Sequence, residues 1–92
     1  MNLTSNALIS GIRPVAYLGK IEAEIFLAYG LIFRPLVFEK AFEELLTRIE
    51  DKAMRLTANY IVGVDMSADP FFEERGQKGI LCTVSGTAAR FE

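Results

Sequence analysis

Two segments late in the chain decide the fold: Leu56-Thr-Ala-Asn-Tyr-Ile-Val-Gly-Val-Asp65 and Gly79-Ile-Leu-Cys-Thr-Val-Ser-Gly-Thr-Ala88. Both are rich in Val, Ile and Thr, which fit the pleated, half-buried surface of a sheet. They predict two strands, over residues 59–66 and 79–89, joined by a polar loop over 67–78. The whole region therefore indicates a helix end, a strand, a loop and a second strand.

An alternating pattern precedes this region. Over residues 15–27 every odd position is apolar or glycine, while Lys20, Glu22 and Glu24 lie between them. This period of two predicts a strand with one face on the core and a polar middle on the other face. Gly19 interrupts the pattern and indicates a β-bulge or a close backbone approach.

A helical pattern lies between these strands. Over residues 35–56 apolar side chains recur every three or four positions, which predicts a helix that opens at Pro35 and covers a sheet with one stripe. The order strand, helix, strand, strand predicts a single α+β domain over residues 1–92. In it, one long helix packs on a mainly antiparallel sheet.

The composition excludes some partners and favours self-association. Of the 92 residues, 51% are apolar and seven are Phe, which is more than the thin core of a small domain hides, so we expect a homo-oligomer. The net charge is −2 and the ten Lys and Arg are scattered along the chain. The chain therefore lacks the basic footprint that nucleic acids and anionic membranes select.

The cysteine usage indicates a compartment. Cys82 is the only cysteine, so the chain forms no internal disulfide and fits a reducing environment. The first ten residues lack the charged and apolar regions of a secretory signal. The longest uncharged apolar stretch, residues 25–33, is about half as long as a membrane span. We expect a cytoplasmic protein that does not enter the membrane.

The late strand pair also resembles a known family. Residues 56–65 and Val84-Ser-Gly-Thr-Ala88 are similar to the motifs L-G-A-N-A-V-V-G-V-D and A-S-G-T-A of the YbjQ-like family. Tyr17-Leu18-Gly19 with Glu24 resembles that family's Y-L-G-x-x-x-G-E, and Phe33-Arg34 its F-R before the helix. The resemblance covers nearly the whole chain and implies a β-α-β-β subunit of a ring, a pentamer. The family carries a heavy-metal-binding label, and no catalytic residues come with it.

The chain departs from the family pattern at several positions. It lacks a glycine-rich insertion before the main helix. Ala23 replaces a glycine, and Glu22 a small polar residue, beside Glu24, which alters any ligand pocket there. Thr57 stands where the family ends its helix with glycine. Because a left-handed position favours glycine, we predict that the helix ends one or two residues later and uses Asn59.

Asp65 lies at the predicted end of a strand, where functional groups often gather. By simple alternation it points to the same face as Ile61. With Ser85, Thr87 and Glu24 it forms our candidate ligand site, suited to a hard cation or a sugar-like hydroxyl group. The alternative is a turn-forming Asp that accepts backbone N–H bonds where the strand ends.

Apart from methionine, Cys82 is the only soft metal ligand in a chain without histidine. Soft-metal sites need two to four thiolate or imidazole ligands, so one chain cannot supply them. The metal hypothesis, which the family label suggests, therefore places Cys82 with Asp65 or Glu24 of adjacent subunits around a divalent or soft cation. The alternative is that Cys82 is a small core residue. It then shares a strand face with Ile80, Val84, Gly86 and Ala88.

Glu22 and Glu24 share the polar face of the first long strand. Paired carboxylates can serve acid–base chemistry. An enzymatic interpretation needs them, or Asp65 with Ser85 and Thr87, to converge in a closed pocket between subunits. It lacks a histidine or an activated nucleophile. The alternative for the glutamates is a solvated face or a row of salt bridges between subunits.

Four apolar residues interrupt polar surroundings. Leu18 and Phe26 break the polar face of the first strand at its two ends, and Phe71-Phe72 lies within the predicted polar loop. Exposed apolar groups of this size mark contact surfaces. We predict that they pack on a neighbouring subunit. For Phe71-Phe72, packing on their own subunit and an external protein partner are the alternatives.

The sequence thus favours a non-enzymatic, cytoplasmic, homo-oligomeric module with a small-ligand site at its subunit interfaces. A metal-binding protein and a small enzyme are the alternatives. No motif identifies the ligand.

Overall fold

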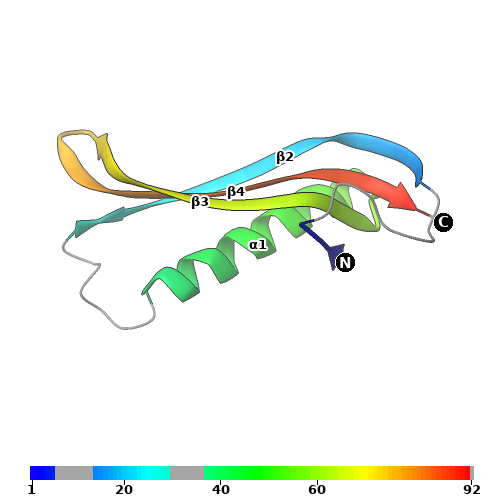
Figure 1. The fold of residues 1–92 in the computed structure, drawn as a ribbon, viewed down its shortest axis with the longest axis horizontal. Helices are drawn as coiled ribbons and strands as arrows, with labels where there is room; N and C mark the ends of the chain where they lie inside the picture. The colour runs from blue at the N-terminus through cyan, green and yellow to red at the C-terminus, as the bar shows by residue number, and fades with distance from the viewer. Residues whose placement is uncertain (6–13, 30–36, 92) are drawn as a thin grey trace.

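A computed structural model describes residues 1–5, 14–29 and 37–91. These ranges contain one helix, α1 (Val37–Arg55), and four strands: β1 (Asn2–Leu3), β2 (Pro14–Ala28), β3 (Tyr60–Glu74) and β4 (Gln77–Phe91). The strands form one sheet in the order β1-β3-β4-β2, and α1 lies across one face of it (Figure 1). β1 pairs parallel with β3, whereas β2 and β3 pair antiparallel with β4. The predicted α+β architecture, one helix on a mainly antiparallel sheet, is confirmed.

The helix packs on the sheet through one stripe. Its buried residues are spaced four apart: Ala41, Leu45, Ile49 and Ala53. Leu45 and Ile49 are fully buried, and burial of each large aliphatic side chain contributes about 1.5–3 kcal/mol. The predicted start at Pro35 lies outside the described residues. Among the described residues, no helix has the length and apolar character that crossing a bilayer requires.

The helix ends at a left-handed residue that is not glycine. Thr57 has a φ of 62°. Its N–H donates to the Met54 carbonyl, and the N–H of Ala58 donates to the Ala53 carbonyl, both at 3.0 Å. This is the Schellman arrangement, which satisfies the last carbonyls of a helix. The prediction that the helix runs on to use Asn59 is therefore wrong, because these two bonds offset the cost of a left-handed threonine.

The β3–β4 hairpin is longer than the sequence predicts. In place of a loop over 67–78, β3 continues to Glu74 and β4 begins at Gln77, so that Arg75 and Gly76 form the turn. These two residues have φ of 50° and 80°, and positive φ at both positions is the requirement of a type I′ turn. The extra strand residues are mostly exposed. Their polar composition is therefore that of a typical loop, which is why the sequence predicts one here.

A bulge between Tyr17 and Gly19 divides β2, as Gly19 indicated. Before the bulge, Val15 and Tyr17 are exposed, and Leu18 packs against the core beneath α1. The prediction that Val15 and Tyr17 face the core and Leu18 the polar side is wrong, because one inserted residue turns the preceding side chains to the other face. Three apolar side chains after the bulge are buried, as predicted: Ile21, Ala23 and Leu27.

Candidate functional site

The sheet face opposite α1 carries a strip of polar side chains. In β4, Cys82, Val84 and Ala88 are buried beneath α1, so the residues between them point to the opposite face. We call these residues, with their neighbours on β2 and β3, the polar strip. Its members are Lys20, Glu22 and Glu24 on β2, Asp65 and Ser67 on β3, and Thr83, Ser85 and Thr87 on β4.

The strand register sets the spacing within the polar strip. Ser85 lies opposite Glu22 of β2 on one side and Asp65 of β3 on the other. Neighbouring strands are about 4.8 Å apart, so the backbones of Asp65 and Glu22 are about 10 Å apart across Ser85. Two carboxylates therefore flank a hydroxyl at a distance that one small ligand can bridge. The next row consists of Ser67, Thr83 and Glu24, which are two hydroxyls and one carboxylate.

A bulge in β3 places Asp65 on this face. Gly63 and Val64 together lie opposite Gly86, and Gly63 has a φ of 62°, in the left-handed region that favours glycine. The prediction that Asp65 shares a face with Ile61 is wrong, because the extra residue shifts the alternation by one. As a result, a carboxylate that would have been buried under α1 is exposed.

The structure brings the predicted ligand residues to one face: Asp65, Ser85, Thr87 and Glu24. Asp65 and Glu24 are exposed, and Ser85 is half-buried. The turn-forming alternative for Asp65 is wrong, because β3 continues past it to Glu74. Sequence reasoning missed Thr83, although its spacing of two from Ser85 was a usable signal.

Aromatic rings close both ends of the polar strip. At one end the rings of Phe26 on β2 and Phe72 on β3 lie 5.9 Å apart between centroids. Gly79 of β4 permits this approach, because a Cβ there would lie 2.8 Å from ring atoms of Phe26 and 2.2 Å from the carbonyl oxygen of Leu27. Two residues predicted to pack on a neighbouring subunit thus contact each other within the chain. At the other end lie the rings of Tyr17, Tyr60 and Phe91.

Cys82 lies on the other side of the sheet. Its side chain is fully buried in the core beneath α1, and burial raises the pKa of its thiol above the ordinary value. Asp65 and Glu24 belong to the opposite face, so Cys82 cannot share a metal ion with either carboxylate of its own chain. The metal hypothesis, which joins adjacent subunits, stays a prediction. Within the described ranges, no group of three or more Cys, Asp or Glu residues is arranged to hold a metal ion.

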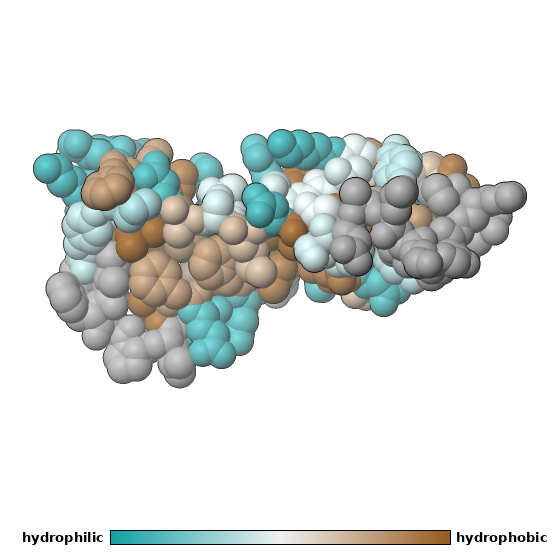
Figure 2. Space-filling model, in the orientation of Figure 1, coloured by the Kyte–Doolittle hydropathy of each residue, from teal (hydrophilic) through white to brown (hydrophobic). Residues whose placement is uncertain are grey.

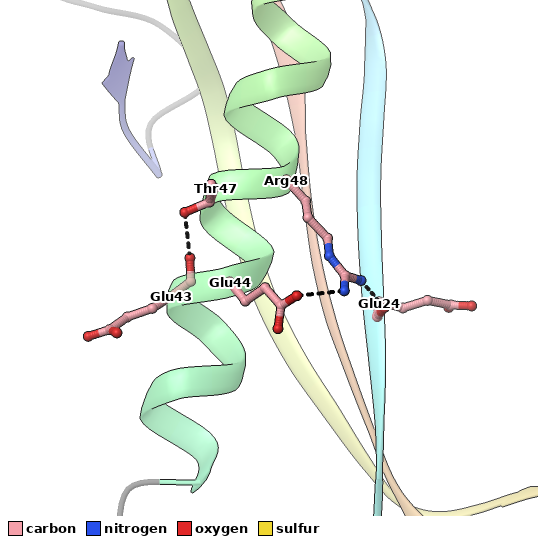
Figure 3. A network of polar contacts seen from close by, with 5 residues as sticks. All are labelled: Glu24, Glu43, Glu44, Thr47 and Arg48. Atoms are coloured by element: carbon pink, nitrogen blue, oxygen red, sulfur yellow. Dashed lines mark hydrogen bonds and ion pairs between the residues drawn. The ribbon is translucent and has the colours of Figure 1, made fainter.

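Two cationic side chains of α1 reach the edge of β2, which the sequence did not indicate. Arg48 donates from Nη1 to the carbonyl oxygen of Glu24 at 3.3 Å and from Nη2 to Oε1 of Glu44 at 2.8 Å. Figure 3 shows this contact, with the Glu24 carboxylate pointing away from α1. One helical turn further, Lys52 donates to the carbonyl oxygen of Glu22 at 2.5 Å. A cleft of about 360 Å³ lies here, lined by Glu22, Ala23, Glu24, Arg48, Lys52 and Thr83.

The contacts at this edge have a consequence for assembly. β2 is an outer strand of the sheet, and an outer strand can pair with another chain through its free backbone groups. The carbonyl oxygens of Glu22 and Glu24 already accept from Lys52 and Arg48. An incoming strand would have to displace both side chains, so the middle of this edge is protected.

No family model matches the chain, and no curated protein matches it. Among solved structures, it is similar to a protein of unknown function of the DUF74 family from Pediococcus pentosaceus. The TM-score is 0.72 and the identity 21%, over 100% of this chain and 98% of that chain. DUF74 is the YbjQ-like family that the sequence motifs resemble. The comparison shows that this chain shares, over its whole length, the fold of a DUF74 protein whose function is unknown.

Proposed function

We propose that this chain is a non-enzymatic subunit that assembles with copies of itself in the cytoplasm and binds a small polar ligand on the polar strip. The observation that carries the proposal is the arrangement of the uncovered sheet face, which joins carboxylates and hydroxyls in its middle to aromatic rings at its ends. Ligand sites commonly combine a few polar groups with apolar walls. A neighbouring copy placed against the rings would supply the missing wall.

The state of the polar groups supports binding over catalysis. Catalytic acids and bases depend on burial and on close charged neighbours that shift their pKa. In the part of the chain that the structure describes, none of the buried residues is polar or charged. Asp65, Glu22 and Glu24 are exposed, which suits groups that exchange water for a ligand.

Exposed apolar side chains support self-assembly. The large apolar residues that are more than half exposed are Val15, Tyr17, Met54, Met66 and Phe71. A 92-residue domain with this many uncovered groups gains by burying them against another chain. The family resemblance implies a ring. A ring that turns the uncovered faces toward its axis would surround one ligand with polar strips from several copies.

Size-exclusion chromatography with light scattering tests the assembly. We expect a mass that is a multiple of the 10.2-kDa chain, with five chains as the specific expectation, and the same mass across a hundredfold range of concentration. A chain that remains monomeric at about 10 μM would overturn the proposal, because interfaces that matter in cells commonly have micromolar or tighter affinity.

Calorimetric titration tests the ligand site, with Ca²⁺ and glucose as probes of the two ligand classes. We expect one of them to bind the wild type. The double variant that carries both Asp65→Asn and Ser85→Ala should bind that probe at least tenfold more weakly. Thr47→Ala, at an exposed site on α1, is the matched control and should bind like the wild type. Equal binding by all three proteins, or binding of neither probe, would count against the polar strip as the site.

A further inference from the structure

An apolar groove lies beside β3 on the helix side of the sheet. It has a volume of about 230 Å³, and the Met66 side chain on its rim is 54% exposed. Figure 2 shows hydrophobic surface, in brown, along this side of the molecule, where the hairpin passes over α1. The groove is lined by Leu3, Thr4, Ser5, Leu46, Val64 and Met66.

The chain also carries a side chain that fits such a groove. Phe71 is 90% exposed, while its neighbour Phe72 packs on Phe26. The segment around it is held in place, because the N–H of Phe71 donates to Oδ1 of Asp69 at 3.0 Å and Tyr29 donates to the carbonyl of Pro70. Phe71 is therefore presented to solvent by fixed backbone.

Phe71 cannot fill the groove of its own chain. It follows Met66 by five positions along β3, a distance of about 16 Å in an extended strand. β3 is paired with β4 on both sides of this interval, so the segment cannot fold back. Phe71 can therefore enter this groove only in another copy of the chain.

We propose that Phe71 of one copy inserts into the groove formed by Leu46, Val64 and Met66 of the next copy. This inference rests on the proposed self-assembly and names its contact. The groove is large enough, since an apolar cavity of about 150 Å³ accepts benzene. A buried phenylalanine removes about 150–250 Å² of surface from water, which is a substantial share of the roughly 800 Å² that each partner buries in a stable interface.

One cation beside Phe71 is opposite in charge to the carboxylates beside the groove. Lys78 lies beside Phe71, in a hollow that also includes Tyr29 and Glu73. On the groove side, Glu43 and Glu50 lie one helical turn before and after Leu46, so they flank it on the same helix face. Insertion of Phe71 brings Lys78 of one copy toward these carboxylates of the next.

The contact is heterologous, because the knob, which is the Phe71 side chain, and the groove are different patches of the surface. Such contacts close into a ring when the rotation permits and otherwise extend as a chain. This explains how one type of contact can give the ring that the family resemblance implies. The protected carbonyls of β2 are not needed for it.

Complementation between two variants tests the inference. Phe71→Ala removes the inserted ring, and Met66→Glu places a charge in the apolar groove. Each should raise the dissociation constant of the assembly about ten- to a hundredfold. Lys40→Glu is the matched control, because Lys40 is exposed and lies outside the groove lining. It should keep the wild-type mass. Circular dichroism confirms that each variant is folded.

An equimolar mixture of the Phe71→Ala and Met66→Glu proteins should form a two-chain complex, since one intact knob meets one intact groove. Lys78→Glu should weaken assembly, and Glu50→Lys in the same chain should restore it. If the wild type assembles but both single variants keep its mass, or if the mixture stays monomeric, the inference is wrong while self-assembly stands. A monomeric wild type would overturn the proposed function as well.

Discussion

Replacement of Gly79 by alanine tests the close approach that forms one end of the polar strip. A Cβ at this position would lie 2.8 Å from two ring atoms of Phe26 and 2.2 Å from the carbonyl oxygen of Leu27. The ring can rotate away, but the carbonyl belongs to β2, which pairs with residue 79 through Ala28. The strand itself must therefore shift.

The expected loss follows from these contacts. Overpacking costs about 1–3 kcal/mol, and loss of the ring contact between Phe26 and Phe72 costs about 0.5–1.5 kcal/mol. We expect Gly79→Ala to lower the free energy of unfolding by about 2–4 kcal/mol. A domain of this size has roughly 5–15 kcal/mol in all, so the variant should still fold.

Urea unfolding followed by circular dichroism, at one fixed protein concentration, measures this loss. Gly86→Ala is the matched control on the same strand. Its new Cβ would meet a side-chain methyl of Ile61 at 2.7 Å and the nearest backbone oxygen only at 3.3 Å, so it should cost less. The backbone clash is absent if Gly79→Ala costs under about 0.5 kcal/mol. It is also absent if the cost disappears in a Phe26→Leu background, where only the contact with the ring has been removed.

Three further predictions concern the backbone, the buried thiol and the core. Thr57 and Gly63 both have a left-handed φ, which favours glycine. Thr57→Gly should therefore raise the free energy of unfolding by about 0.5–1 kcal/mol, and Gly63→Ala should lower it by about 1–2 kcal/mol, as measured by urea unfolding. Burial raises the pKa of the Cys82 thiol above its ordinary value near 9.0. The contribution of the protonated thiol to the free energy of unfolding is therefore fully present below that value and is lost as the pH rises through the folded-state pKa. The stability advantage of the wild type over Cys82→Ala should shrink between pH 7 and pH 10. Ile49→Ala should cost about 2–5 kcal/mol, since Ile49 is fully buried, whereas the exposed Thr47→Ala should cost under about 0.5 kcal/mol by thermal or urea unfolding.

Much of the candidate site was predictable. Alternation along β2 and β4 places Glu22, Glu24, Ser85 and Thr87 on polar faces, and the structure joins those faces in one strip. Asp65 was the exception, because the bulge at Gly63 cannot be located by counting residues. Glycine in a strand signals a possible bulge, yet it does not say whether the next side chains change face.

The contacts between distant elements were not predictable. Arg48 and Lys52 form an ordinary charged face in the sequence, and their bonds to β2 depend on how α1 is placed over the sheet. The separation of Phe71 from Phe72 likewise depends on the bulge that precedes Phe72 and on the nearness of Phe26 across β4.

The two segments at residues 56–65 and 79–88 show which properties are local and which depend on the tertiary structure. Composition and period along the chain specify the strands, the order of elements and the buried stripe of α1, because these properties act over a few neighbouring residues. The pairing of strands far apart in the chain decides three other properties. These are whether Asp65 is buried or exposed, which aromatic rings meet, and which apolar groove remains open. Register is a property of two segments at once, and so the face on which a ligand or a second copy can bind appears only when the sheet is assembled.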